Sequence, residues 1–89
     1  MAVTDNRDRG RFELVEDGLT AFARYKRTGN HVVIPHVEAP PALRGKGTAG
    51  RLMDGIVALA RTEGFTITPT CTYAAMWFHR HKEAHDVLE

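Results

Sequence analysis

The strongest chemical signal in this 89-residue sequence is a basic, glycine-rich stretch at residues 44–50. Its three glycines allow the backbone to approach a ligand closely. The stretch precedes a predicted helix, so free backbone N–H groups and the positive end of the helix dipole point at one place. Arg44, Lys46 and Arg51 add three positive charges, and residues 39–53 contain no acidic residue. These features predict a site for a phosphate or pyrophosphate, and the alternative is a flexible turn with solvated charges.

Two better-known phosphate motifs do not fit this stretch. A P-loop requires Gly-Lys-Ser or Gly-Lys-Thr after a four-residue gap, and that ending is missing from the sequence. A dinucleotide-binding Gly-x-Gly-x-x-Gly motif fits Gly45 and Gly47, but Gly50 is followed by further helix. A chain of 89 residues also leaves no room for a dinucleotide-binding fold.

Hydrophobic periodicity predicts the strands that precede the stretch. Residues 11–16 and 19–26 alternate between polar and apolar types as half-buried strands do, and Asp17-Gly18 between them is typical of a hairpin turn. Residues 31–39 are rich in β-branched side chains and form a third predicted strand. Pro35 within it predicts a bulge or a sheet edge, because proline cannot donate to a strand ladder.

The rest of the chain is predicted to form a helix, a strand and a second helix. Apolar spacing predicts a helix over 48–63 that ends at Gly64, a strand over 65–68, and a second helix over 72–81. The predicted order is β-β-β-α-β-α, an α/β single domain with a mostly antiparallel sheet and two main helices. Residues 1–10 are expected to be a flexible leader and 11–89 the domain, with the structure of 82–89 left open.

Composition narrows the class of protein. A net charge of +1, from 12 basic and 11 acidic residues, provides no overall field that would attract nucleic acid or a membrane. A single cysteine excludes an internal disulfide, and no apolar run approaches the roughly 20 residues that span a bilayer. The N-terminus does not resemble a signal peptide, so we expect a cytoplasmic protein. A domain this short favours a surface groove over an enclosed pocket.

Three stretches together resemble the GNAT superfamily of acetyl-CoA-dependent N-acetyltransferases. Arg44-x-x-Gly47-x-Ala49 matches the Arg/Gln-x-x-Gly-x-Gly/Ala loop of that superfamily. His-Val-Glu-Ala-Pro at 36–40 and Pro-Thr-Cys-Thr-Tyr at 69–73 are similar to His-Thr-Glu-Val-Pro and Pro-x-Cys-x-Tyr of a very small GNAT-like family.

The resemblance covers about residues 11–85, with departures at Val37, Ala39 and residues 81–84. At 81–84 this chain has His-Lys-Glu-Ala where the small family often has His-Pro-Glu-Tyr. The resemblance implies a truncated GNAT fold, reduced to the half that binds the coenzyme, without the usual substrate-binding helices.

The resemblance also implies that acetyl-CoA is the co-substrate. The amides of the loop would hold the pyrophosphate, and the exposed edge of the third strand would pair with the pantetheine amides. The residues expected to bind the coenzyme are Val37, Glu38, Ala39, Arg44, Gly45, Lys46, Gly47, Thr48 and Ala49. We expect no metal, because His81 and His85 lack a carboxylate or cysteine at a recognisable spacing.

Two candidate bases lie on the third strand. Glu38 would take a proton from the acceptor ammonium, which requires partial burial to raise its pKa toward neutrality. His36 points to the same face and is an alternative base, with an ordinary pKa of about 6.5. The alternatives are an exposed strand carboxylate and a hydrogen-bonded structural histidine.

Cys71 and Tyr73 are the other catalytic candidates. Cys71 lies near a predicted helix start, where the helix dipole favours a thiolate that could accept the acetyl group. Its alternative role is that of a small buried hydrophobic residue. Tyr73 would supply a hydroxyl to the leaving coenzyme thiolate, or else only pack. An acylated Cys71 predicts ping-pong kinetics, whereas a base on the strand predicts direct transfer.

Three functions compete at this point. The first is an N-acetyltransferase that acts on a primary amine, and the second is a non-catalytic module that binds coenzyme A or acyl-CoA. The third, an adaptor that touches a phosphate backbone, is disfavoured by the net charge and by the lack of aromatic residues around the loop. We expect no nucleic-acid or membrane partner and a monomer or weak homodimer. A protein lysine, a polyamine and an aminoglycoside all remain open as acceptors, and an open site favours a large one.

Overall fold

The computed structural model describes residues 3–89 and contains the α/β fold predicted from the sequence, with one strand more. The elements are β1 (Thr4–Asn6), β2 (Arg11–Glu16), β3 (Leu19–Thr28), β4 (His31–Glu38), α1 (Thr48–Glu63), β5 (Thr66–Pro69) and α2 (Thr72–Arg80). Two short 3-10 helices are η1 (Pro41–Leu43), before α1, and η2 (Lys82–Val87), after α2. None of the described helices is both long and apolar enough to cross a membrane.

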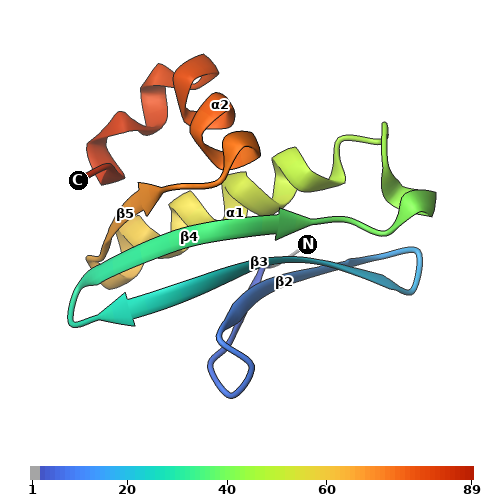
Figure 1. Ribbon diagram of the computed structural model, residues 1–89, viewed down its shortest axis with the longest axis horizontal. Coiled ribbons are helices and arrows are strands. Elements are labelled where there is room, and N and C mark those ends of the chain that lie inside the picture. The colour runs from blue at the N-terminus through green and yellow to red at the C-terminus, as the bar shows by residue number, and fades with distance from the viewer. Residues whose placement is uncertain (1–2) are drawn as a thin grey trace.

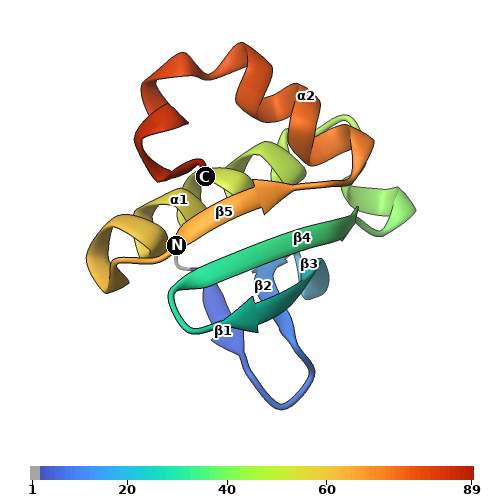
Figure 2. The same ribbon diagram turned by 60° about the vertical axis from the view of Figure 1, so that its left-hand side comes forward.

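The five strands form one sheet in the order β1-β2-β3-β4-β5. The first four pair antiparallel, while β4 and β5 are parallel because α1 carries the chain back between them. Figures 1 and 2 show α1 lying across one face of the sheet and α2 lying beyond the β5 edge. The sheet and α1 together therefore position the residues that join β4 to α1.

A single hydrophobic core lies between the sheet and the helices. The strands contribute Phe12, Leu14, Ala21, Ala23, Val32, Ile34 and Ile67, and the helices contribute Leu52, Met53, Ile56, Val57, Ala60, Ala74, Trp77, Phe78, Ala84 and Val87. These side chains follow the alternating and helical spacings of the sequence. On the opposite face of the sheet, the side chains of Arg24, His36 and Glu38 are exposed, whereas that of Phe22 is half-buried.

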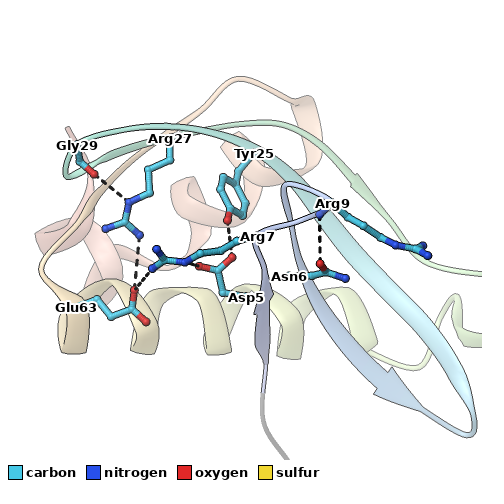
Figure 3. Close-up of polar contacts among 8 residues, drawn as sticks. All are labelled: Asp5, Asn6, Arg7, Arg9, Tyr25, Arg27, Gly29 and Glu63. Carbon is cyan, nitrogen blue, oxygen red and sulfur yellow. Dashed lines mark hydrogen bonds and ion pairs between the residues drawn. The ribbon is translucent and has the colours of Figure 1, made fainter.

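Residues 1–10, predicted to be a flexible leader, contain a strand, so that prediction is wrong for residues 4–6. β1 pairs antiparallel with the start of β2. Figure 3 shows the side chains that hold this segment: the Tyr25 hydroxyl donates to Asp5 at 2.5 Å, and Arg7 lies 3.8 Å from Glu63 of α1. Backbone pairing and polar contacts hold β1, so its sequence lacks the apolar alternation that would identify it. Residues 1–2 lie outside the described residues.

Pro35 marks the bulge predicted from the sequence. The register of β3 and β4 shifts beside it, so that residues 34 and 35 of β4 lie opposite Tyr25 alone. β4 pairs with β5 only as far as Ile34. Beyond that point the two strands separate, and the β5-facing edge of residues 36–38 has no partner strand in the described part of the chain.

The C-terminal segment, left open by the sequence, closes the far end of the core. Arg61 of α1 donates two hydrogen bonds to the Asp86 carboxylate, at 2.9 and 2.8 Å. His85 Nε2 lies 2.7 Å from the Phe78 carbonyl oxygen at the end of α2. Leu88 forms a parallel bridge to β5. These contacts tie the segment to both helices and to the sheet.

Candidate functional site

A surface cleft of about 530 Å³ opens where β4 and β5 separate. Its lining residues are His36, Val37, Glu38, Ala39, Leu43, Arg44, Gly45, Gly47, Thr48, Ala49, Gly50 and Tyr73. The cleft thus brings together the end of β4, the loop before α1 and the start of α2, the same three stretches that carry the sequence resemblance. Of the residues predicted to bind the coenzyme, Lys46 is the one that does not line it.

The loop before α1 has the geometry of an anion site. Gly45 and Gly47 have φ angles of 78° and 80°, which glycine adopts without strain. The backbone N–H groups of Gly45, Gly47, Thr48, Ala49 and Gly50 make no hydrogen bond to any residue from 3 to 89. Several of them belong to the first turn of α1, which has no preceding carbonyls to bond and lies at the positive end of the helix dipole. The predicted anion site therefore has five free donors.

The positive charge at this loop is smaller than the sequence predicts. Arg51 donates Nε and Nη2 to the Glu16 carboxylate, each at 2.7 Å, and the Thr48 hydroxyl donates to the same carboxylate at 2.6 Å. The Arg51 guanidinium, and then the Thr48 hydroxyl, hold the pKa of Glu16 at about 2, below its ordinary 4.5. Lys46 Nζ lies 3.7 Å from Asp17. The three predicted positive charges are present, but Glu16 at the end of β2 and Asp17 in the turn that follows it, both outside residues 39–53, balance two of them.

Arg44 is the cation of this loop that has no carboxylate partner among the described residues. Its Nε donates to the Ala39 carbonyl at 3.2 Å, which joins the loop to the end of β4. Its charge remains free to meet an anion that enters the cleft.

His36 and Glu38 form a hydrogen-bonded pair at one side of the cleft. His36 Nε2 lies 3.0 Å from Glu38 Oε1, and their side chains are 49% and 52% exposed. They lie on the same face, as strand alternation predicts, beside the ring of Phe22. The partial burial that the proposed role of Glu38 as a base requires is not found. The carboxylate instead shares a hydrogen bond with the His36 imidazole.

Cys71 and Tyr73 occupy different environments despite their two-residue spacing. Cys71 is the N-cap of α2: its Sγ accepts a hydrogen bond from the Ala74 N–H at 3.3 Å, and its side chain packs against the core. It is not a lining residue of the cleft. Tyr73 lines the cleft and is 41% exposed. Burial, and then the Asp54 carboxylate, raise the pKa of Tyr73, so its hydroxyl is protonated at neutral pH.

A second groove, of about 780 Å³, was not anticipated from the sequence. It lies between α1 and α2 and shares Gly47, Gly50 and Tyr73 with the cleft, so the two are continuous. Its other lining residues are Arg51, Asp54, Thr72, Met76, Trp77, Arg80 and His81. A methionine at position 76, in a short predicted helix that already has apolar residues for the core, is the sequence signal that could have indicated it; in the structure Met76 is exposed. The sequence does not indicate which face of α1 lies opposite Met76, because tertiary packing decides it.

The histidines near the C-terminus bond to the backbone. His81 Nδ1 lies 2.7 Å from the Trp77 carbonyl oxygen, as His85 does from that of Phe78, so both help to satisfy the last carbonyls of α2. Within residues 3–89, no group of three or more His, Cys, Asp or Glu side chains is arranged to hold a metal ion.

Comparison with known proteins places the chain in a family. Residues 11–87 match the family described as GCN5-related N-acetyl-transferase, so the chain belongs to this family, whose members generally use acetyl-CoA and an amine acceptor. The fold is similar to the solution NMR structure of a GCN5-like protein from Staphylococcus aureus, with a TM-score of 0.74 and 22% identity. The match covers 98% of this chain and 86% of that chain. No curated protein matches the sequence.

Proposed function

We propose that this protein transfers the acetyl group of acetyl-CoA to a primary amine. The observation that carries the proposal is the cleft, in which the unpaired edge of β4 meets five free backbone N–H groups at the start of α1. An extended ligand fits this arrangement if its amides face the β4 edge and its pyrophosphate faces the free N–H groups. Acetyl-CoA is such a ligand, and the family assignment supports it.

The coenzyme would lie along the cleft with each part facing matching groups. The pyrophosphate would accept hydrogen bonds from the free N–H groups between Gly45 and Gly50 and would neutralise Arg44. The pantetheine amides would pair with the backbone of residues 37–39. The groove between α1 and α2 continues the cleft and offers space for the remainder of the molecule.

The chemistry that the cleft supports best is direct transfer. His36, oriented by its hydrogen bond to Glu38, would take a proton from the acceptor ammonium, and the free amine would attack the thioester carbonyl. The tetrahedral intermediate then collapses with cleavage of the C–S bond, and its nitrogen releases its second proton to solvent. Tyr73 would donate a proton to the departing coenzyme thiolate and regain one from solvent. The position of Cys71, capping α2 and packed on the core, favours this route over a covalent acetyl-cysteine.

A non-catalytic module that binds coenzyme A or acyl-CoA is the second candidate. The exposure of His36 and Glu38 favours it, because no described element covers this side of the cleft to form an enclosed acceptor site. The same openness suits a large acceptor, such as a lysine on a protein surface, if the protein is an enzyme.

Calorimetry with coenzyme A, followed by thiol release from acetyl-CoA across a panel of amines, tests the proposal. The panel contains a lysine peptide, a polyamine and an aminoglycoside. We expect binding and turnover, with His36→Ala lowering kcat by about 100-fold or more and leaving coenzyme affinity unchanged. His79→Ala is the matched control, since His79 is an exposed histidine that does not line the cleft.

Each outcome of this experiment selects one function. Turnover that falls in His36→Ala and not in His79→Ala supports the transferase with His36 as its base, and turnover that His36→Ala leaves unchanged supports the transferase without that base. Binding of coenzyme A without transfer to any amine of the panel supports the binding module, and a wild-type protein that does not bind coenzyme A contradicts both.

A further inference from the structure

We propose that Glu16, at the end of β2, is a positioning residue that holds the loop before α1 in its anion-binding conformation through Arg51 and Thr48. The inference rests on the proposed function, since the anion for this loop is the coenzyme pyrophosphate. Glu16 lies outside the three stretches that resemble GNAT motifs and does not line the cleft. Its effect on the coenzyme would therefore be indirect.

The contacts of Glu16 are those of a rigid clamp. Its carboxylate accepts two parallel hydrogen bonds from Arg51 and a third from Thr48, all between 2.6 and 2.7 Å. A bidentate arginine–carboxylate pair defines both the position and the plane of the guanidinium. The side chain of Glu16 is only 16% exposed and Thr48 is buried, whereas Arg51 is 39% exposed, so water competes weakly at the carboxylate end of these hydrogen bonds.

Arg51 passes this constraint to the loop. Its Nη2 donates to the Lys46 carbonyl oxygen at 2.9 Å, and its backbone N–H donates to the Gly47 carbonyl oxygen at 3.0 Å. A Cβ atom at Gly47 would lie only 3.1 Å from Arg51 Nη1, so the guanidinium sits directly against the loop backbone. Two loop carbonyls thus bond to Arg51, and the neighbouring N–H groups remain free.

The alternative role for Arg51, as a direct ligand of the pyrophosphate, is disfavoured by its surroundings. Both Nε and Nη2 are already bonded to Glu16, whose carboxylate balances the charge of Arg51. Arg51 lines the groove between the helices and not the cleft. Without Glu16, the guanidinium would stand beside Lys46 and Arg44 with less opposing charge, and the loop would lose its anchor to the sheet.

A clamp of this kind acts by pre-organisation. A loop that contains two glycines at positive φ has many conformations in isolation, and ordering it on binding would reduce affinity. Holding the loop in advance removes part of that cost before the ligand arrives. The effect is confined to the pyrophosphate end of the coenzyme, because the clamp does not touch the edge of β4.

The test compares Glu16→Gln with Asp86→Asn, which breaks a similar bidentate pair at the other end of α1. Calorimetry measures the Kd for coenzyme A and for pantetheine, which lacks the pyrophosphate. We expect Glu16→Gln to weaken coenzyme A binding by about tenfold and to leave pantetheine binding unchanged, while Asp86→Asn alters neither. Backbone ¹⁵N relaxation of the free protein should show lower order at Gly45 and Gly47 in Glu16→Gln alone.

The outcomes separate this inference from the proposed function. Wild-type protein that does not bind coenzyme A contradicts the proposed function and the clamp with it. Wild-type binding with Glu16→Gln equal to it, or weakened equally for both ligands, overturns the clamp alone. If Glu16→Gln does not fold, Arg51→Gln takes its place, because it removes both arginine hydrogen bonds to Glu16 and the one to the Lys46 carbonyl oxygen.

Discussion

The hydrogen-bond partners of individual atoms distinguish the roles of the side chains in and near the cleft. The Cys71 sulfur accepts the Ala74 N–H and so replaces the hydroxyl or carboxylate that usually caps a helix. The Tyr73 side chain, only two residues further along the chain, lines the cleft. In the same way, His36 and Glu38 act as a pair because Nε2 and Oε1 lie 3.0 Å apart. Residue type alone does not separate these roles.

The capping role of Cys71 makes a residue-scale prediction. Cys71→Ser preserves a cap, whereas Cys71→Ala should lower the free energy of unfolding by about 0.5 kcal/mol, the low end for lost caps, because a thiol is a weak acceptor. Both variants should keep acetyl transfer. Denaturant unfolding and intact-mass spectrometry after incubation with acetyl-CoA measure the two effects. A stable acetyl adduct that disappears in Cys71→Ala together with turnover would establish the covalent route instead.

Among the elements, α1 connects most of the molecule. Its first turn presents the free N–H groups, Arg61 near its end holds the C-terminal segment, and Glu63 lies within 3.8 Å of both Arg7 and Arg27. Gly55 lies at the middle of the helix against Val3, which precedes β1. The absence of a side chain at Gly55 lets the N-terminal segment lie on the helix.

An element-scale prediction follows for Gly55→Ala. The added Cβ would overlap the Val3 side chain, so β1 should detach from the sheet even though alanine favours the helix by about 1 kcal/mol. Amide hydrogen exchange should rise in residues 4–6 and remain slow in β3 and β4. The double variant Gly55→Ala/Val3→Gly removes the overlap and should recover part of the protection. Unchanged exchange in the single variant would mean that Val3 moves aside freely.

Over the whole molecule, the small net charge of +1 includes carboxylates that form ion pairs with arginines. Hydrogen bonds from Arg51 and Arg61 lower the pKa of Glu16 and of Asp86, respectively. A carboxyl group whose pKa is lower in the folded than in the unfolded state stabilises the fold above its unfolded pKa. That contribution is lost as the pH falls through the folded pKa.

Acid unfolding tests whether these carboxylates with lowered pKa stabilise the fold. For Glu16 the window runs from about pH 4.5 down to about pH 2, so the Tm of the wild type should fall across it. Glu16→Gln should start from a lower Tm at neutral pH and show a shallower decline, as followed by circular dichroism. Asp8→Asn, which removes an exposed carboxylate without an ion pair in the described structure, is the control. Parallel curves for Glu16→Gln and the wild type would contradict the prediction.

Much of the fold was predictable because its signals are local. The Asp17-Gly18 turn has positive φ at both residues, Pro35 lies at a bulge, and Gly64 ends α1 in the left-handed conformation, each as the residue types indicate. β1 and the C-terminal segment were not predictable in this way. Contacts such as those of Tyr25 with Asp5, and the packing of η2, hold them, and neither leaves a periodic pattern.

By itself, the sequence determined the order of the elements from β2 to α2, the glycine-rich loop and the residue types of the cleft, because these depend on the spacing of neighbours along the chain. Only the tertiary structure decided which charges meet. Glu16 and Arg51 are 35 positions apart, yet their side chains lie 2.7 Å from each other, and this pair reduces the cationic cluster predicted at the loop. Hydrogen bonding and charge pairing depend on distance in space, which the sheet sets by bringing the β2–β3 turn to the start of α1.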